Sequence, residues 1–118
     1  PDAILAAILT ADRIAMADCA SFADATTAAN GGAQIIGTTL SGYAGDPMPA
    51  DGAPDFALVR QFRTLPQFVM AEGRFNTPAL AAMAMTAGAD AVTVGSALTR
   101  LEHVTTWFND AVQQAPRG

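Results

Sequence analysis

The sequence predicts an α/β fold in which short parallel strands alternate with helices. Three observations indicate this: apolar segments of strand length recur along the chain, a helix start follows most of them, and glycine or proline marks the junctions. The expected strands lie near 13–18, 34–39, 67–72 and 90–95, so that successive strands start about 20 to 34 residues apart. Strands and helices that alternate at this spacing are typical of βαβ units and a parallel sheet.

Composition limits the class of the protein. The chain has 118 residues, of which 51% are hydrophobic and 14% charged, which indicates one globular domain and not a disordered segment. The net charge of −5 argues against partners such as nucleic acid or an acidic membrane, because both require basic patches. We find no signal-peptide pattern and no apolar run long enough to cross a bilayer, so the expected location is the cytoplasm.

Two residue types that occur once restrict the chemistry. Cys19 is the one cysteine and His103 the one histidine. No intrachain disulfide can form, and we expect neither a metal site nor a serine-type catalytic triad.

The first helices and strand can be placed from local signals. PDAILAAIL (1–9) reads as the end of a helix already under way, and with the missing initiator methionine it suggests the back part of a longer protein. An apolar strand follows at 13–18. Ser21 and Asp24 have the spacing of a capping box and begin a helix that ends at Gly31–Gly32.

Capping residues also mark the later helices. A loop rich in glycine and proline (41–54) follows the second strand, and Asp55 caps the helix after it. Thr77 and Pro78 begin the next helix, since proline suits the first helical position, and that helix ends at Gly88. The last helix is expected to place on one stripe Val104, Trp107, Phe108, Ala111 and Val112.

Two architectures fit these elements: a small open doubly wound domain, and half of a (β/α)8 barrel, which typically needs about 250 residues. The chain supplies four of the eight strands, and its start favours the C-terminal half of a barrel. Such a half leaves strands 13–18 and 90–95 as unpaired edges and exposes the face that lines the barrel. We therefore expect dimerisation, aggregation or low stability for the isolated chain.

Each expected strand ends in polar residues or glycine. The ends read Asp18, Thr38–Thr39, Glu72–Gly73 and Gly95–Ser96. In a barrel these ends surround one mouth, where the chemistry takes place. The sequence therefore predicts a shared mouth with carboxylates, hydroxyls and free backbone.

The segment VGSA (94–97) has two interpretations. After the eighth strand of a barrel it would form a phosphate site, with Gly95 and Ser96 at the anion and Arg100 as a clamp. Alternatively, Gly95 only makes a tight turn and Arg100 is a solvated side chain.

Glu72 also has two interpretations. It lies two residues from Arg74 and could form a surface ion pair with it, which would contribute roughly 0–1 kcal/mol. Alternatively, the strand delivers the carboxylate to a partly dry mouth as a general acid or base.

A resemblance to a known family decides between these interpretations. GTTLSGY (37–43), AEGRFNTP (71–78) and VGSALTR (94–100), in this order after MADC (16–19), resemble the last half of the N-acetylmannosamine-6-phosphate 2-epimerases, a family of (β/α)8 barrels. The resemblance extends over about residues 14–112. It implies an isomerase that interconverts N-acetylmannosamine 6-phosphate and N-acetylglucosamine 6-phosphate by proton transfer at C2. No cofactor is implied, because nothing is oxidised overall.

The resemblance also assigns the site residues. It implies that Glu72 is catalytic and that the phosphorylated amino sugar is bound by Asp18, Arg100 and Thr38. Gly73, Gly95 and Ser96 are expected at the phosphate.

One feature of the family is missing from this chain. The family's catalytic lysine lies on an earlier strand, and this chain has no lysine. We therefore predict an incomplete fragment that is inactive by itself and that forms a homodimer or associates with the missing half of the barrel. The alternatives are another phosphosugar isomerase or lyase barrel, and a non-catalytic half-barrel that binds a phosphorylated ligand.

Overall fold

Ten helices and strands make up the described part of the chain. The structure is a computed structural model that describes residues 2–44 and 52–116. In chain order the elements are α1 (Asp2–Thr10), β1 (Met16–Asp18), α2 (Phe22–Asn30), β2 (Ile35–Gly37), α3 (Phe56–Phe62), β3 (Phe68–Glu72), α4 (Pro78–Ala87), β4 (Ala91–Thr93), α5 (Ser96–Thr99) and α6 (Leu101–Gln114).

The four strands form one parallel sheet in the order β1-β2-β3-β4. Each strand pairs with the next one along the chain, as in a sector of a (β/α)8 barrel. A doubly wound sheet reverses its strand order at a switch point, and the order of the four described strands contains no reversal. The prediction of parallel βα repeats that form half of a barrel is therefore confirmed.

The paired strands are shorter than the expected segments. β2 ends at Gly37 and β4 ends at Thr93, so the last residues of the expected strands 34–39 and 90–95 lie beyond the ladder. Gly95, for example, has φ −104° and ψ −87°, which is not a strand conformation. The polar residues that follow these strands thus lie on the turns that leave the sheet.

The register of the strands gives the sheet two different faces. Ala17, Ile36 and Val69 lie side by side across three strands, and the latter two are fully buried. In the adjacent row, Met16 and Phe68 are 39% and 42% exposed. This second face is the one that would line a barrel, and it is uncovered here, as expected from the sequence.

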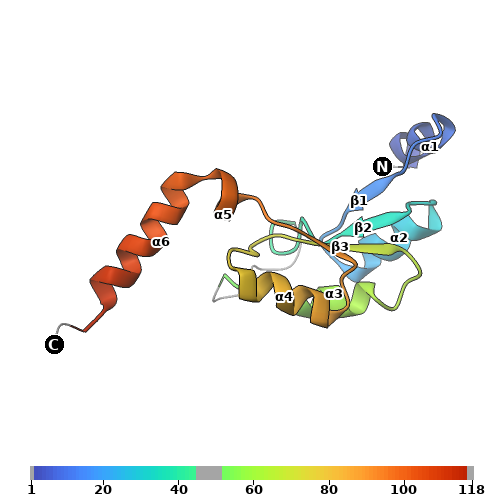
Figure 1. The fold of residues 1–118 in the computed structure, drawn as a ribbon. Coiled ribbons are helices and arrows are strands. Elements are labelled where there is room, and N and C mark those ends of the chain that lie inside the picture. Colours follow the sequence, from blue (N-terminus) through green and yellow to red (C-terminus); the bar gives the residue numbers. More distant parts are fainter. Residues whose placement is uncertain (1, 45–51, 117–118) are drawn as a thin grey trace.

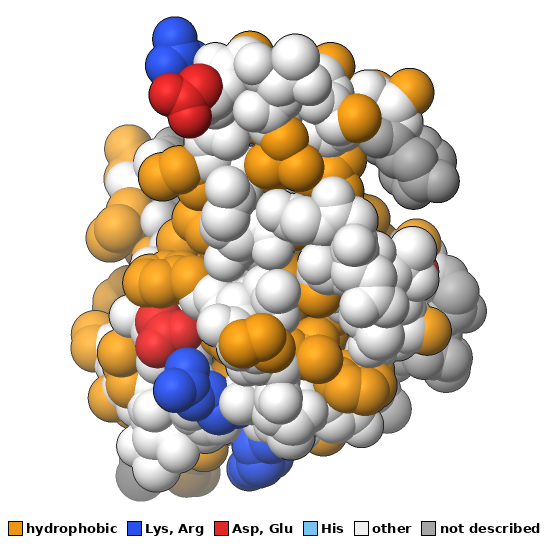
Figure 2. Space-filling view, turned by 90° about the vertical axis from the view of Figure 1, so that its right-hand side faces the viewer, with side chains coloured by type: hydrophobic (Ala, Val, Ile, Leu, Met, Phe, Trp, Pro, Cys, Tyr) orange, Lys and Arg blue, Asp and Glu red, His pale blue; other side chains and the backbone are white. Residues whose placement is uncertain are grey.

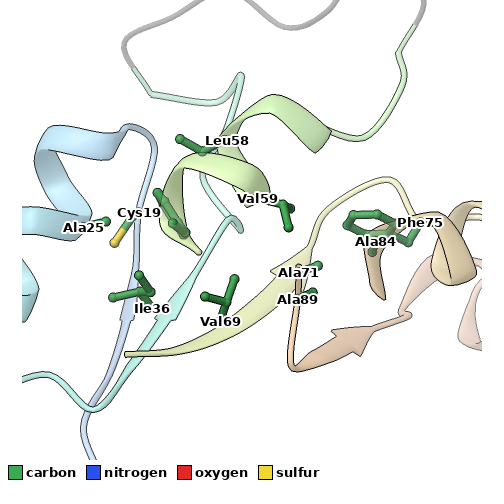
Figure 3. Packing of buried hydrophobic residues seen from close by; sticks show 11 residues of the cluster. Cys19, Ala25, Ile36, Leu58, Val59, Val69, Ala71, Phe75, Ala84 and Ala89 are labelled. Carbon is green, nitrogen blue, oxygen red and sulfur yellow. The ribbon is translucent and has the colours of Figure 1, made fainter. Parts of the chain in front are cut away.

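Helices α2, α3 and α4 cover the first face and enclose the core (Figure 3). Phe62 of α3 is the largest fully buried side chain, and it packs in one cluster with Ile36 and Val69 of the sheet. Phe75, just beyond β3, packs edge-on against Phe56 with the ring centroids 5.8 Å apart. Burial of these apolar side chains supplies the main driving force for folding.

The helix caps are those expected from the sequence. Ser21 and Asp24 form a capping box at the start of α2. The side chains of Asp55 and Thr77 each accept a hydrogen bond from the backbone of the first turn, of α3 and α4 respectively. Gly88 ends α4 with a φ of 109°, a left-handed conformation that glycine adopts without a steric penalty.

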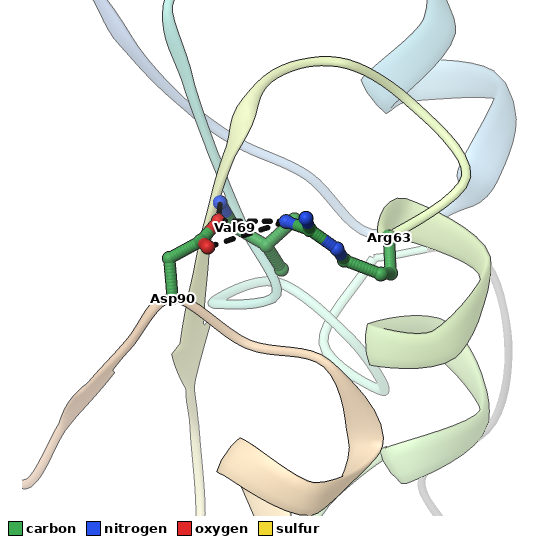
Figure 4. A network of polar contacts seen from close by, with 3 residues as sticks. All are labelled: Arg63, Val69 and Asp90. Carbon is green, nitrogen blue, oxygen red and sulfur yellow. Dashed lines mark hydrogen bonds and ion pairs between the residues drawn. The ribbon is translucent and has the colours of Figure 1, made fainter.

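A polar network at the start of β3 fastens the sheet to α3 (Figure 4). The Asp90 carboxylate accepts a hydrogen bond from the Val69 backbone N–H at 2.8 Å and pairs with the Arg63 guanidinium at 3.2 Å. This network lies at the opposite end of β3 from Glu72. It therefore supports the fold without taking part in the mouth.

Helices α1 and α6 extend from opposite ends of the molecule (Figure 1). The molecule measures 62 × 25 × 25 Å and has a radius of gyration of 16.5 Å, whereas a compact domain of about 100 residues would have roughly 13 Å. Helix α6 contains no buried residue, and its Leu101, Phe108 and Val112 are 76%, 71% and 70% exposed. The apolar stripe expected on this helix is thus present but uncovered.

Hydrophobic side chains also reach the surface beside α1. Figure 2 views the molecule from the side on which α1 lies in Figure 1, and shows many hydrophobic and few charged side chains. A mainly apolar hollow of about 520 Å³ opens between α1, β1 and α2, next to the free edge of β1. Among the described residues, no helix has the length and apolar character needed to span a membrane.

Candidate functional site

A hollow of about 240 Å³ lies at the carboxyl ends of the central strands. It brings together four of the residues predicted for the site, namely Glu72, Gly73, Gly95 and Ser96. Its other lining residues, which the sequence analysis did not assign, are Thr39, Tyr43, Arg74, Phe75, Asn76 and Thr93. The shared mouth expected from the strand ends is therefore present between β3, β4 and the turn after β2.

The backbone of Glu72 is fixed by a neighbouring strand. The Thr38 hydroxyl donates to the Glu72 carbonyl oxygen at 2.8 Å and accepts from the Glu72 N–H at 3.0 Å. Thr38 is only 2% exposed, so both bonds are protected from competition with water. The end of β3 is thus held to the turn after β2, and the Glu72 side chain starts from a fixed point.

The carboxylate of Glu72 is held by the next residue along that turn. The Thr39 hydroxyl lies 3.1 Å from Glu72 Oε2 and 2.9 Å from Asp18 Oδ1. Thr39 therefore connects the Asp18 side chain at the end of β1 to the hollow, although Asp18 itself lines the larger apolar hollow beside α1.

Thr38 was predicted to contact the substrate, and its position does not support that role. Its side chain points to the helix-covered face of the sheet, where its hydroxyl is engaged with the Glu72 backbone. The following residue, Thr39, lies in the turn after β2 and lines the hollow. Thr39 is therefore the threonine of this turn that a ligand in the hollow would meet.

Arg74 does not form the surface ion pair with Glu72 that the sequence left open. Its Nε and Nη1 groups donate to the backbone carbonyls of Ala53 and Ser41, both at 2.8 Å. The guanidinium carbon also lies 5.7 Å from the centroid of the Tyr43 ring. Arg74 therefore fastens both described ends of the long loop after β2 to the rim of the hollow. Among the described residues, no ion pair joins the Glu72 carboxylate to a cation.

The two glycines of the hollow have different reasons to be glycine. Gly73 has a φ of 100°, which other residues rarely adopt, and it makes the turn by which the chain leaves β3. Gly95 has a negative φ, and a Cβ added there would meet nothing within 4 Å. Packing therefore does not require glycine at Gly95, and the open space beside it could hold a bound group.

Arg100 lies outside this hollow. Its guanidinium forms a hydrogen-bonded ion pair with Glu102, which lowers the pKa of that carboxyl. The Arg100 side chain is 55% exposed. The role of Arg100 as a clamp on the ligand stays a prediction, and in this structure its guanidinium is paired with the Glu102 carboxylate.

Cys19 is not available as a nucleophile. Its side chain is buried beneath α2, and burial together with the negative charges of Asp24 and Asp18 raises the thiol pKa to about 11. The thiol is therefore protonated at neutral pH. Across residues 2–44 and 52–116, no group of three or more His, Cys, Asp or Glu side chains is placed to hold a metal ion.

The sequence of the chain matches a known family. A family model described as "Putative N-acetylmannosamine-6-phosphate epimerase" (NanE) matches residues 1–114. The chain belongs to this family. The "Putative N-acetylmannosamine-6-phosphate 2-epimerase" of Vibrio cholerae serotype O1 (strain M66-2) is 56% identical over 112 residues, which cover 95% of this chain and 46% of that protein. The "Bifunctional enzyme NanE/NanK" of Brucella melitensis is 55% identical over 106 residues, which cover 89% of this chain and 20% of that protein.

A solved structure agrees with this membership. The N-acetylmannosamine-6-phosphate 2-epimerase from Clostridium perfringens superposes with a TM-score of 0.87 and 33% sequence identity. The superposition covers 93% of this chain and 48% of that one. The chain thus spans about half the length of the Vibrio and Clostridium proteins, in agreement with the four strands of its sheet.

Proposed function

We propose that this chain supplies part of the active site of an enzyme that interconverts N-acetylmannosamine 6-phosphate and N-acetylglucosamine 6-phosphate. The observation that supports this most directly is the placement of Glu72. Its backbone is held by Thr38, its carboxylate is held by Thr39, and it lines one hollow with Gly73, Gly95 and Ser96.

The proposed reaction is a proton transfer at C2 of the open-chain sugar. The C2 proton is acidified by the adjacent carbonyl, so a carboxylate can remove it as a general base and leave an enediolate-type intermediate. Return of a proton to the opposite face of C2 inverts the centre. The Glu72 carboxylate is suited to one of these steps because it forms no ion pair with a described residue and its position is fixed by Thr38 and Thr39.

Inversion requires a second acid–base group on the other face of C2. The ionisable side chains that line the hollow are Glu72, Tyr43 and Arg74, and Arg74 is engaged with the loop carbonyls. The chain contains no lysine. We therefore assign the second group to a segment outside this chain, and we expect the chain alone to be inactive.

The size of the hollow also supports a shared site. Ligand pockets usually have about 300–1,000 Å³, whereas this hollow has about 240 Å³. We infer that further βα units pair with the free edges of β1 and β4, cover the exposed face of the sheet and complete the pocket. The missing half of the barrel is the partner we favour, because the matched relatives are about twice as long. When that half is absent, we expect copies of this chain to associate with one another through the same strand edges.

The proposed ligand also indicates the cellular compartment in which the protein works. Sugar phosphates are charged and do not diffuse across membranes, so we propose that the protein works in the cytoplasm, where such metabolites are made and used.

Deuterium incorporation in D₂O tests the proposal. N-acetylmannosamine 6-phosphate is followed by NMR with the chain alone, and with the chain mixed with the part of the Vibrio cholerae relative that precedes the matched region. We expect deuterium at C2 only in the mixture. Tight binding of pentose phosphates in preference to the amino-sugar phosphate would favour another phosphosugar barrel. Thermal stabilisation by the amino-sugar phosphate without exchange in the mixture would favour a purely binding half-barrel.

A further inference from the structure

Three side-chain oxygens lie in a row at the mouth of the sheet. Asp18 Oδ1 is 2.9 Å from the Thr39 hydroxyl oxygen, which is 3.1 Å from Glu72 Oε2. The three residues come from β1, from the turn after β2 and from β3. Both outer groups are carboxyl groups, and the central hydroxyl carries one hydrogen.

The register of the sheet explains why these residues meet. Asp18, Gly37 and Met70 lie side by side in β1, β2 and β3. Glu72 lies two residues beyond Met70 on β3, and Thr39 lies two residues beyond Gly37 in the turn that leaves β2. The parallel pairing thus brings the ends of the three strands together, and the turn after β2 places the Thr39 hydroxyl close to both carboxyl groups.

One hydrogen between two carboxylates is an unusual arrangement. When both carboxyl groups are ionised, the hydroxyl can donate fully to only one of them at a time. When Asp18 carries a proton, that proton can be donated to Thr39 Oγ1 while the Thr39 hydrogen is donated to Glu72 Oε2, which gives a continuous chain of hydrogen bonds. The positions of the two carboxyl groups then depend on each other through Thr39.

The surrounding charges do not provide another link between Asp18 and Glu72. Arg74, the cation of the hollow, donates to the carbonyls of Ser41 and Ala53. On the other side, Asp18 lines the larger hollow with Cys19 and Asp24, and neither of these is a cation. The Thr39 hydroxyl is thus the connection between the two carboxyl groups among the described residues.

We propose that Thr39 is a positioning residue that couples Asp18 to Glu72 by sharing its hydroxyl hydrogen between them. The shared bond orients the Glu72 carboxylate toward the hollow. It also gives a route by which a proton on Asp18 reaches Glu72, as the Asp18 proton moves to Thr39 Oγ1 and the Thr39 hydrogen moves to Glu72 Oε2, with the hydroxyl restored. The coupling itself does not depend on the proposed function; only its use in catalysis rests on that function.

The coupling can be tested without substrate. We would record the carboxyl ¹³C resonances of Asp18 and Glu72 in the labelled full chain, in H₂O and in D₂O, with D18N and E72Q to assign the two signals. A shared Thr39 deuteron should shift both signals by more than it shifts the signal of Asp110, which lies exposed on α6. Excess shift at only one of the two carboxyls, or at neither, would contradict the sharing.

Two substitutions separate the hydroxyl from the shape of the side chain. Thr39→Ser keeps the hydroxyl, so the excess shift should remain at both carboxyls. Thr39→Val keeps the branched shape without the hydroxyl, so the shift at both should fall to the Asp110 value. If the valine variant keeps the excess shift, the proposal is wrong. Should that variant not fold, the measurement on the unmodified chain decides by itself. None of these measurements needs turnover, so their failure is distinct from a failure to exchange the C2 proton.

Discussion

The Thr38 hydroxyl and the Glu72 backbone form a reciprocal pair of hydrogen bonds, 2.8 Å to the carbonyl oxygen and 3.0 Å from the N–H. This pair joins the turn after β2 to the end of β3 across 34 residues of sequence. It fixes the point from which the Glu72 side chain enters the hollow. The stability of the sheet and the geometry of the site therefore share one contact.

Replacement of Thr38 should weaken both the stability of the sheet and the positioning of Glu72. Thr38→Val keeps the shape but leaves the buried Glu72 backbone groups without a partner, which should lower the free energy of unfolding by about 1–3 kcal/mol. Urea denaturation measures the change. Thr38→Ser, which keeps the hydroxyl, is the matched control and should recover most of the loss. Equal stability of the valine variant and the unmodified chain would show that the pair contributes nothing.

Gly95 should tolerate alanine in the fold but not in the ligand site. A Cβ at this position meets nothing within 4 Å, so Gly95→Ala should change the free energy of unfolding by less than about 0.5 kcal/mol. The methyl group would occupy the space assigned to the phosphate, so affinity for the sugar phosphate should fall. Calorimetric titration of the assembled enzyme measures the affinity.

Gly73 provides the contrast to Gly95. Its φ of 100° makes Gly73→Ala strained, so that variant should lose about 1 kcal/mol or more of stability. If Gly95→Ala, in contrast, leaves the affinity for the sugar phosphate unchanged, the assignment of Gly95 to the phosphate site is wrong.

Arg74 should stabilise the fold by holding the loop after β2, and not by pairing with Glu72. Arg74→Ala removes two hydrogen bonds to the Ser41 and Ala53 carbonyls and the contact with the Tyr43 ring. The free energy of unfolding should fall by roughly 1–3 kcal/mol. Arg60→Ala, on the exposed side of α3, removes the same charge without these contacts and should be nearly neutral. Similar losses for the two variants would indicate a general charge effect.

Cys19 should make stability fall at high pH. The folded chain raises the thiol pKa from 9.0 to about 11, so between these values the unfolded chain loses its thiol proton while the folded chain retains it. The stability that the buried thiol contributes is present below pH 9 and is lost as the pH rises toward 11. The difference in the free energy of unfolding between the unmodified chain and Cys19→Ala should therefore decrease over this range. A difference that is constant with pH would contradict the raised pKa.

Local signals in the sequence predicted the helix boundaries because caps are local. The capping box of Ser21 and Asp24 and the left-handed end at Gly88 depend on residues a few positions apart. The parallel order of the strands followed from the spacing of the βα units. Glu72, Gly73, Gly95 and Ser96 could be placed at one mouth because the carboxyl ends of parallel strands meet.

The remaining features depend on contacts that spacing does not specify. The distinction between Thr38 and Thr39 requires the side-chain alternation to be counted from a paired residue such as Gly37. The partners of Arg74 lie 21 and 33 residues away and are backbone carbonyls, for which no residue type is diagnostic. Arg100 pairs with Glu102 on the uncovered α6, and no motif predicted that arrangement.

Hydrogen–deuterium exchange at C2 with a Glu72 variant tests the central claim most directly. The chain, assembled with the N-terminal part of the Vibrio cholerae relative, would be incubated in D₂O with N-acetylmannosamine 6-phosphate and followed by NMR. Glu72→Gln keeps the size of the side chain but removes its basicity, and it should reduce the exchange rate by at least about 10²-fold. Asp110→Asn, an exposed control on α6, should leave the rate unchanged. Exchange at the full rate in the Glu72→Gln assembly would show that another group moves the C2 proton and would contradict the account.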